Sequence, residues 1–243
     1  MILEGTRLKP IVVTEYPKSG GTWLTSMLGH LFNWPCRDIY VREGFSQFDI
    51  SKHPWYREAS ALDFPEQCVV KSHELPESGL IDFDATYIHL YRDGRDVTVS
   101  KYFFEKEFLV RNEIVGSFDK SFPDFVSATA AEWAAYVRSW TKCNAIQVAY
   151  EALLRDAAST LGRIVSEIPE AVASKDEIAR AVAANTKARL SASLADTFKH
   201  NTFVRKGVEG DWRNYFSDED TRVFESLAST ELAMLGYSLQ ARG

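Results

Sequence analysis

Short apolar runs alternate with longer amphipathic segments along this chain, a pattern that predicts a parallel β-sheet flanked by helices. The apolar runs have the length of buried strands, whereas the longer segments repeat their apolar residues at helical spacing. Strands are predicted at 11–15, 68–72, 86–91 and 145–150. Helices are predicted at 21–32, 95–104, 124–142, 152–168, 175–184 and 218–235.

Two stretches, 33–67 and 106–123, do not follow either period. Long irregular stretches in compact domains are often lids or pocket walls. We find no repeat, no low-complexity tract and no shift in composition along the 243 residues. The simplest expectation is therefore one α/β domain that spans 1–243.

Composition and charge narrow the class of protein. Hydrophobic residues make up 45% and charged residues 26% of the chain, as in globular domains. The net charge of −6 argues against a nucleic-acid partner, because nucleic-acid-binding domains usually present a basic face. We also expect no membrane partner, since no run of eighteen apolar residues and no secretory leader occurs.

The cysteines give no sign of a metal site or a disulfide framework. Cys36, Cys68 and Cys143 form no C-x-x-C pair and are odd in number. We therefore expect no metal and a reducing, cytoplasmic environment.

A glycine turn between the first predicted strand and helix is the strongest chemical signal. There, backbone N–H groups and the positive end of the helix dipole converge on an anion, and Lys18 adds a positive charge. The lysine precedes both glycines, so the turn is not a Walker P-loop, and ATP is not implied. The turn reads Tyr16-Pro17-Lys18-Ser19-Gly20-Gly21-Thr22-Trp23.

A second segment near the C-terminal end also places cations beside glycines, and it reads Arg205-Lys206-Gly207-Val208-Glu209-Gly210-Asp211-Trp212. Together with the first turn, it resembles the two cofactor signatures of the cytosolic-type sulfotransferases. This family uses 3'-phosphoadenosine 5'-phosphosulfate (PAPS) and releases PAP. Two further segments, 91–100 and 70–73, are similar to the family's 3'-phosphate-binding strand and helix and to its Lys-Thr/Ser-His segment.

The resemblance implies a P-loop-like fold and a PAPS-dependent sulfotransferase that acts on a hydroxyl or amine of a small molecule by in-line transfer. It implies that His73 is the general base and that Lys18 is the cation at the leaving phosphate. Lys71, two residues before His73, is expected on the same face as a further catalytic cation. The remaining cofactor-binding residues implied by the resemblance are Ser19, Gly20, Gly21, Thr22, Trp23, Arg92, Ser100, Tyr150, Thr186, Phe203, Arg205, Lys206 and Gly207.

The chain also departs from the family pattern. Gly21 stands where many members have a threonine, which removes one hydroxyl contact, and Arg95 is added close to the site. The family's dimerisation stretch after Trp212 is not preserved, so that a monomer or a dimer is expected.

The acceptor is left open by the sequence. Aromatic residues in or beside the irregular stretches suggest an apolar pocket, although ordinary core packing is an equal alternative. These residues are Phe45, Phe48, Trp55, Tyr56, Phe103, Phe104, Phe108, Phe118 and Phe122. Two other functions stay open as alternatives, a non-catalytic PAP-binding protein and an ATP-dependent, kinase-like transferase.

Overall fold

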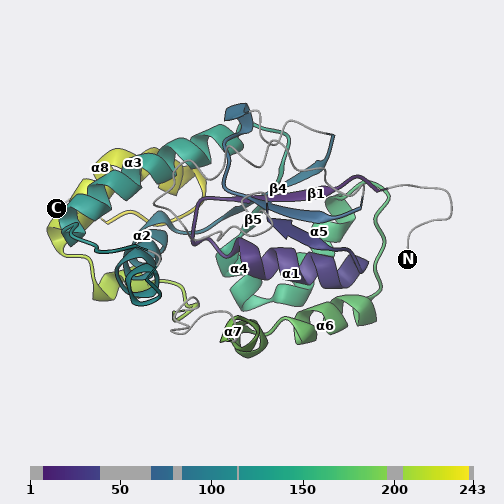
Figure 1. Ribbon diagram of the computed structural model, residues 1–243. Helices are drawn as coiled ribbons and strands as arrows, with labels where there is room; N and C mark the ends of the chain where they lie inside the picture. Colours follow the sequence, from purple (N-terminus) through teal and green to yellow (C-terminus); the bar gives the residue numbers. More distant parts are fainter. Residues whose placement is uncertain (1–7, 39–66, 79–83, 114, 196–204, 241–243) are drawn as a thin grey trace.

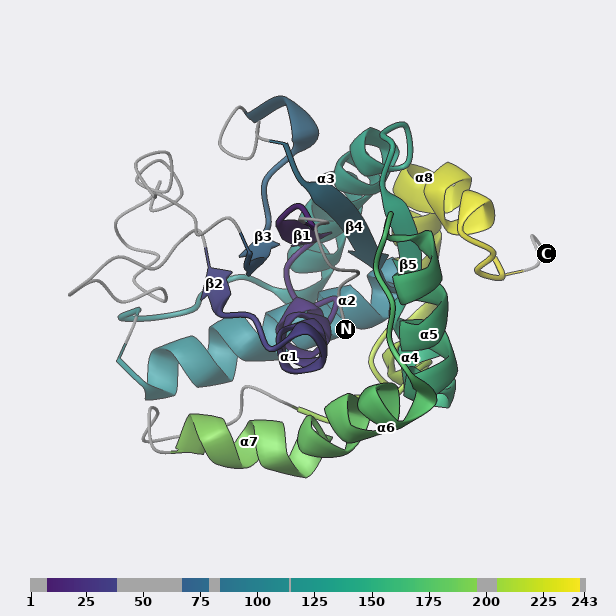
Figure 2. The ribbon, with the colours of Figure 1, turned by 90° about the vertical axis from the view of Figure 1, so that its right-hand side faces the viewer.

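The computed structural model describes residues 8–38, 67–78, 84–113, 115–195 and 205–240. Its centre is a parallel sheet in the order β2-β3-β1-β4-β5, which Figure 2 shows from left to right. The strands are β1 (Ile11–Glu15), β2 (Cys36–Asp38), β3 (Val69–Ser72), β4 (Thr86–Tyr91) and β5 (Ile146–Ala149). The predicted parallel α/β sheet is therefore confirmed, with β2 as a strand that the sequence pattern did not indicate.

Helices cover both faces of the sheet (Figure 1). On one face lie α1 (Gly21–Phe32), α4 (Tyr150–Arg155), α5 (Ala157–Glu167) and α6 (Lys175–Ala184). On the other lie α3 (Phe122–Trp140) and α8 (Asp218–Met234). The remaining elements are α2 (Gly94–Phe103), a π-helical continuation at Phe104–Leu109, α7 (Lys187–Ala195), and two 3₁₀ turns at Pro76–Ser78 and Asp211–Asn214.

The alternation of side chains along β1 explains the two layers. Val12 packs with α3 and α8, whereas Ile11 and Val13 pack with α1 and the helices beside it. All five residues of β1 are buried, as expected for a central strand with helices on both faces. The fully buried Trp133 and Trp140 fill much of the α3 side.

Several boundaries differ from the sequence-based expectation. The helix predicted at 152–168 is two helices, because Asp156 ends α4 and then accepts a hydrogen bond from the Ser159 amide as the N-cap of α5. The helical chain after α2 runs on through Leu109, so the stretch 106–123 is not wholly irregular. The helix α7 was also missing from the prediction.

The order of the strands indicates where a ligand can bind at the edge of the sheet. From β1 the chain moves toward β3, and from β4 it moves to β5 on the opposite side. In open α/β sheets, ligands bind outside the carboxyl ends of the strands where the connections diverge in this way. The expected site therefore lies beyond the ends of β1 and β4.

Candidate functional site

The glycine turn follows directly from the end of β1. Lys18 adopts a φ of 77° and Gly20 a φ of 105°, and Gly20 is the N-cap of α1. A side chain at Gly20 is excluded, because its Cβ would lie 2.6 Å from the Tyr150 ring. The buried Ser19 hydroxyl donates to the Tyr16 carbonyl at 2.8 Å, and the half-buried Thr22 is the second residue of the helix. Ser19 therefore closes the turn that leads into α1.

Lys18 is the cation at the centre of this site. Burial lowers the pKa of Lys18 to about 7, and the positive charges of Lys71, Arg92 and Arg205 act in the same direction. The Glu15 carboxylate opposes this shift. Since these residues come from β1, β3, the end of β4 and the C-terminal loop, the structure brings together cations that are far apart in the sequence.

Arg92, which follows β4, connects the glycine turn to the C-terminal loop. Its guanidinium donates to the carbonyls of Lys18 at 3.3 Å and Val208 at 3.0 Å, and it lies 4.6 Å from the centre of the Tyr150 ring. Its Nε is buried and has no hydrogen-bond partner among the described residues, and the same is true of Nε of Arg205. Two buried guanidinium donors without partners fit an anionic ligand such as a phosphate.

The C-terminal loop is held in place by two carboxylates. Asp96, in the first turn of α2, accepts from the amides of Gly210 at 2.6 Å and Trp212 at 2.8 Å. Asp211 accepts from Arg205 at 2.7 Å and from Lys206 at 2.8 Å. Although burial acts to raise it, the hydrogen bonds from Lys206 and Arg205 hold the pKa of Asp211 at about 2.

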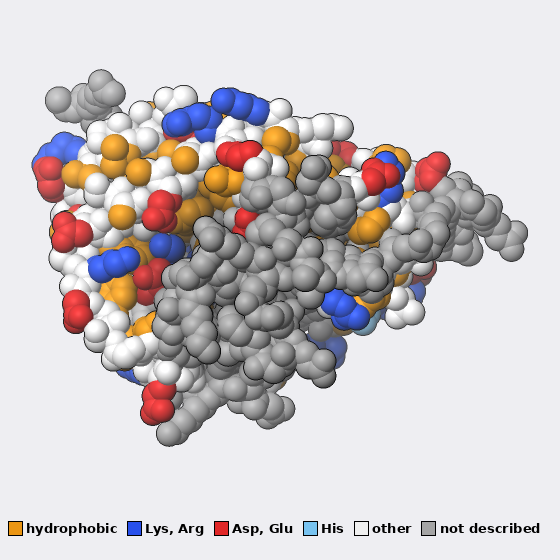
Figure 3. Space-filling model, turned by 45° about the horizontal axis from the view of Figure 1, so that its top comes forward, with side chains coloured by type: hydrophobic (Ala, Val, Ile, Leu, Met, Phe, Trp, Pro, Cys, Tyr) orange, Lys and Arg blue, Asp and Glu red, His pale blue; other side chains and the backbone are white. Residues whose placement is uncertain are grey.

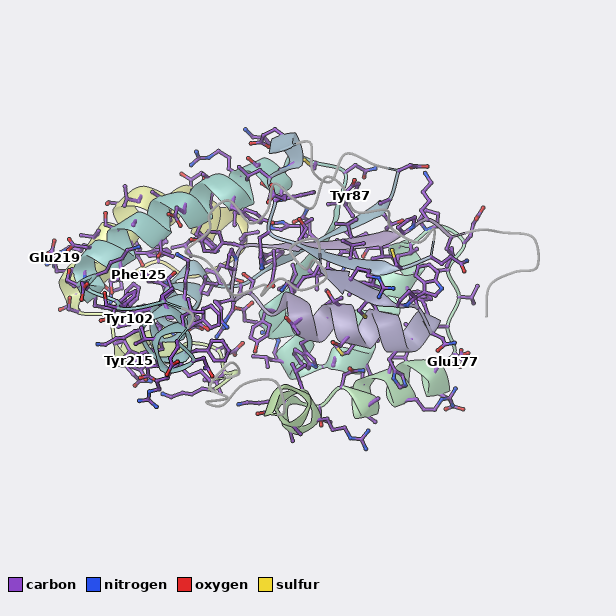
Figure 4. The ribbon with its side chains drawn as sticks, in the orientation of Figure 1. Tyr87, Tyr102, Phe125, Glu177, Tyr215 and Glu219 are labelled. Atoms are coloured by element: carbon purple, nitrogen blue, oxygen red, sulfur yellow. The ribbon has the colours of Figure 1, made fainter. Side chains whose placement is uncertain are left out.

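Rings from two elements lie where α2 meets this loop. Tyr215 stacks below the cations of Arg205 and Lys206, at 5.4 and 5.2 Å, and Phe103 packs against it. Figure 4 shows Tyr215 near Tyr102 and Phe125 at the same end of the molecule. These rings position the cations of the loop.

His73 lies one residue beyond β3 and is half-buried. Its Nδ1 is 2.9 Å from the carbonyl oxygen of Glu15. A carbonyl only accepts hydrogen bonds, so Nδ1 carries the proton and Nε2 of the neutral ring is left as an acceptor. The bond to the Glu15 carbonyl thereby fixes the orientation of the imidazole.

Trp23 and Tyr150 lie together beside the turn, with ring centroids 6.1 Å apart and planes at 73°. The indole N–H of Trp23 donates to the Asn185 carbonyl at 2.7 Å, which places the neighbouring Thr186 close to these rings. Tyr150 is the first residue of α4 rather than the end of a strand. Gly207 lies beside the Tyr150 hydroxyl.

The other candidate residues lie as follows. Ser100 is half-buried in α2, and Phe203 lies outside the described residues. Among the aromatic residues, Phe104 lies 4.0 Å from the Lys18 ammonium and stacks on Phe108, whereas Phe118 and Phe122 pack against Tyr102. The four from the earlier stretch, Phe45, Phe48, Trp55 and Tyr56, lie outside the described residues.

Two residues of the site were missed by sequence reasoning, Glu15 and Asp96. Glu15 is the last residue of the first predicted strand, and Asp96 lies within the segment 91–100 that resembles the family's phosphate-binding strand and helix. Both acids are buried, which residue type alone does not reveal. On the face shown in Figure 3, acidic and basic side chains are interspersed among apolar ones.

Metal and membrane features can be tested on the described part of the chain. Within the described residues, no three His, Cys, Asp or Glu side chains are grouped so as to hold a metal ion. None of the helices described here has both the length and the apolar character of a membrane span.

A family profile and curated relatives both identify the same family for this chain. The profile of the sulfotransferase domain matches residues 8–236. Mouse sulfotransferase 1B1 is 24% identical over 250 residues, covering 92% of this chain and 82% of the relative. Mouse sulfotransferase 2B1 is 26% identical over 248 residues, covering 89% and 69%.

Solved structures show the same fold. Mouse sulfotransferase SULT7A1, complexed with PAP, superposes with a TM-score of 0.71 at 20% identity, covering 93% of this chain and 84% of that one. Retinol dehydratase in a complex with retinol and PAP gives a TM-score of 0.69 at 20% identity, covering 98% and 84%. The predicted fold class is therefore confirmed.

Proposed function

This chain belongs to the sulfotransferase domain family, and from that premise we propose that it moves the sulfuryl group of PAPS to a hydroxyl or amine of a small-molecule acceptor. The observation that carries the proposal is the convergence of Lys18, Arg92 and Arg205 at the strand ends, beside an imidazole held as an acceptor. The PAP named in the titles of related structures supports the choice of nucleotide.

PAPS supplies the activated sulfuryl group and a leaving phosphate when it is bound. In-line transfer builds negative charge on that phosphate, so Lys18 and the positive end of the α1 helix dipole are the groups that stabilise it. A phosphate dianion beside Lys18 would favour its charged form and return its pKa toward the ordinary range. Lys71 adds positive charge on the side of the transferred group.

His73 takes the proton of the acceptor through Nε2 while Nδ1 remains bonded to the Glu15 carbonyl. Positioned general bases contribute about 10²- to 10⁴-fold to rate. The guanidinium groups of Arg92 and Arg205, together with Ser100 and Lys206, are the proposed partners of the 3'-phosphate. Trp23 and Tyr150, which lie together, are the proposed contacts of the adenine.

Phe104 supports an apolar acceptor. Its ring lies against the Lys18 ammonium, so it borders the position where the sulfuryl group is transferred. One relative, retinol dehydratase, has been solved with androsterone and with retinol, which are both apolar small molecules. We therefore propose an apolar alcohol or phenol as the acceptor class.

The nucleotide assignment is tested by thermal unfolding with PAP and with ATP. A ligand at about a thousand times its Kd adds about 4 kcal/mol to the free energy of unfolding. PAP is expected to raise the melting temperature more than ATP at equal concentration. An equal or larger effect of ATP would favour the kinase-like alternative.

The catalytic role is tested with the variant His73→Ala. We expect normal PAP affinity by calorimetry and a loss of about 10²- to 10⁴-fold in transfer from labelled PAPS during an acceptor screen. Full activity in this variant would contradict the role of His73. If the wild-type protein binds PAP and transfers no sulfate to any acceptor, the non-catalytic alternative is supported.

A further inference from the structure

Glu15, the last residue of β1, is a buried acid inside a site made for anions. Its side chain is only 3% exposed, and its Oε2 accepts the amide hydrogen of Gly21 at 2.5 Å. Gly21 is the first residue of α1, so the carboxylate takes one of the free N–H groups at the positive end of that helix. The protein therefore carries an anion of its own beside the turn that the proposed function assigns to a phosphate.

Gly21 is the residue that makes room for this carboxylate. A Cβ at Gly21 would lie 2.4 Å from both Cδ and Oε1 of Glu15. Because Glu15 is buried at a strand end, its side chain has little space in which to withdraw. The acid at position 15 thus requires a glycine in place of the common threonine at position 21.

The same carboxylate also acts on Lys18. Burial and the cations Lys71, Arg92 and Arg205 all lower the pKa of Lys18, and Glu15 is the group that raises it. Burial raises the pKa values of the Tyr136 and Tyr150 phenols, and the negative charge of Glu15 acts in the same direction. Glu15 is thus the negative charge that offsets a predominantly cationic surrounding.

We propose that Glu15 is a positioning residue of this enzyme, which fixes the glycine turn through Gly21 and favours the charged form of Lys18 that sulfuryl transfer requires. The proposal rests on the proposed function, because it assumes that Lys18 meets a phosphate. It explains why an acid is retained in a site whose ligand is an anion.

The first test compares the pH dependence of PAP affinity in the wild type and in Glu15→Gln, by calorimetry. The affinity of Lys18 for the phosphate is expected to fall as the pH rises through its pKa. Loss of the neighbouring negative charge moves a pKa by about one unit or more, so the fall should begin at lower pH in Glu15→Gln. At about pH 8 the variant should bind PAP about tenfold more weakly than the wild type.

A matched control removes one carboxylate elsewhere. Glu167→Gln alters an acid whose side chain is 43% exposed and pairs with Arg163 on α5, and it should leave the profile unchanged. An identical profile for Glu15→Gln and the wild type would overturn the proposal. A wild-type protein that does not bind PAP at all would instead reject the proposed function.

The second test measures the coupling between Glu15 and Gly21. Gly21→Ala should lower PAP affinity about tenfold in the wild type and have little effect in Glu15→Ala, where the space is free. Equal losses in both backgrounds would overturn the proposed pairing. If Gly21→Ala alone does not fold, the double variant Glu15→Ala/Gly21→Ala decides the question. A folded double variant supports the proposed pairing, and a double variant that also fails to fold contradicts the pairing.

Discussion

At Lys18 the backbone has a φ of 77°, and the side chain is held half-buried beside three other cations. Both features are unfavourable for a lysine in the free protein. They are typical of a residue that is held ready for an anion, because a bound phosphate offsets the burial of positive charge. The site therefore reduces the stability of the protein before the ligand arrives.

A variant without the charge tests this conclusion. Below about pH 7, Lys18 is charged in both the folded and the unfolded states, and burial makes the charged folded state unfavourable. Lys18→Met should therefore be more stable than the wild type near about pH 6. Above the folded pKa of about 7 the buried lysine loses its proton, so the difference should shrink until about pH 10, the unfolded pKa.

The measurement is the free energy of unfolding in denaturant at several pH values, without nucleotide. Methionine preserves the length of the side chain, so packing and backbone strain change little. A difference that is constant with pH would show that packing, and not charge, distinguishes the two proteins. PAP should stabilise the wild type and have little effect on the variant.

At the scale of elements, α2 and the C-terminal loop form one unit through Asp96. The carboxylate is buried and accepts two amide hydrogens of the loop, from Gly210 and Trp212. Asp96→Ala would leave both amides without partners in a buried place. We expect a loss of about 2–4 kcal/mol in the free energy of unfolding and a clear loss of PAP affinity.

Asp119→Ala, which removes an exposed acid outside the site, is the control for this prediction and should change neither quantity. Chemical denaturation and calorimetry give the two values. Retained PAP affinity in Asp96→Ala would mean that the loop reaches the nucleotide without help from α2.

The elements also show which parts of the fold the sequence can predict. Strand β1 and helix α1 have strong apolar patterns, and their predicted bounds agree with the structure. Strand β2, Cys36–Asp38, has no such pattern, because its position depends on pairing with β3. The break at Asp156 is invisible to periodicity, since one residue both ends α4 and caps α5.

The site also has features that the sequence predicts and features that it does not. Motifs indicated the cations and His73, because residue type and spacing carry that information. The partner of the imidazole, the Glu15 carbonyl, belongs to the backbone and leaves no trace in residue type. The Glu15 side chain was overlooked because its role depends on its contact with Gly21. That contact forms only when the turn is folded.

For the whole molecule, the two hydrophobic clusters share one sheet. The cluster with α3 and α8 includes Val12 and Val70, and the cluster with α1 includes Ile11, Val13 and Val69, so neighbouring residues of the same strands belong to both. Loss of either cluster would expose the central strands. We therefore expect one cooperative unit, in agreement with the single domain predicted at 1–243.

Scanning calorimetry tests this expectation. A single transition with equal calorimetric and van't Hoff enthalpies is predicted, and PAP should move the whole transition upward. Two transitions, of which only one responds to PAP, would show that the clusters unfold independently. Such a result would contradict the single-domain prediction.

The buried Arg95 fork connects distant parts of the chain, since it binds Asp93 at 2.8 Å, Glu225 at 3.0 Å and the Ser238 carbonyl at 3.0 Å. Ser238, near the C-terminal end of the described residues, thereby braces the segment that carries Arg92. A truncated protein that lacks Ser238 would lose the hydrogen bond from Arg95 to its carbonyl. Truncation before Ser238 should therefore weaken catalysis, although the deletion is distant from Lys18. An affinity tag fused at this end could have the same effect, and a tag-free protein is the better reference.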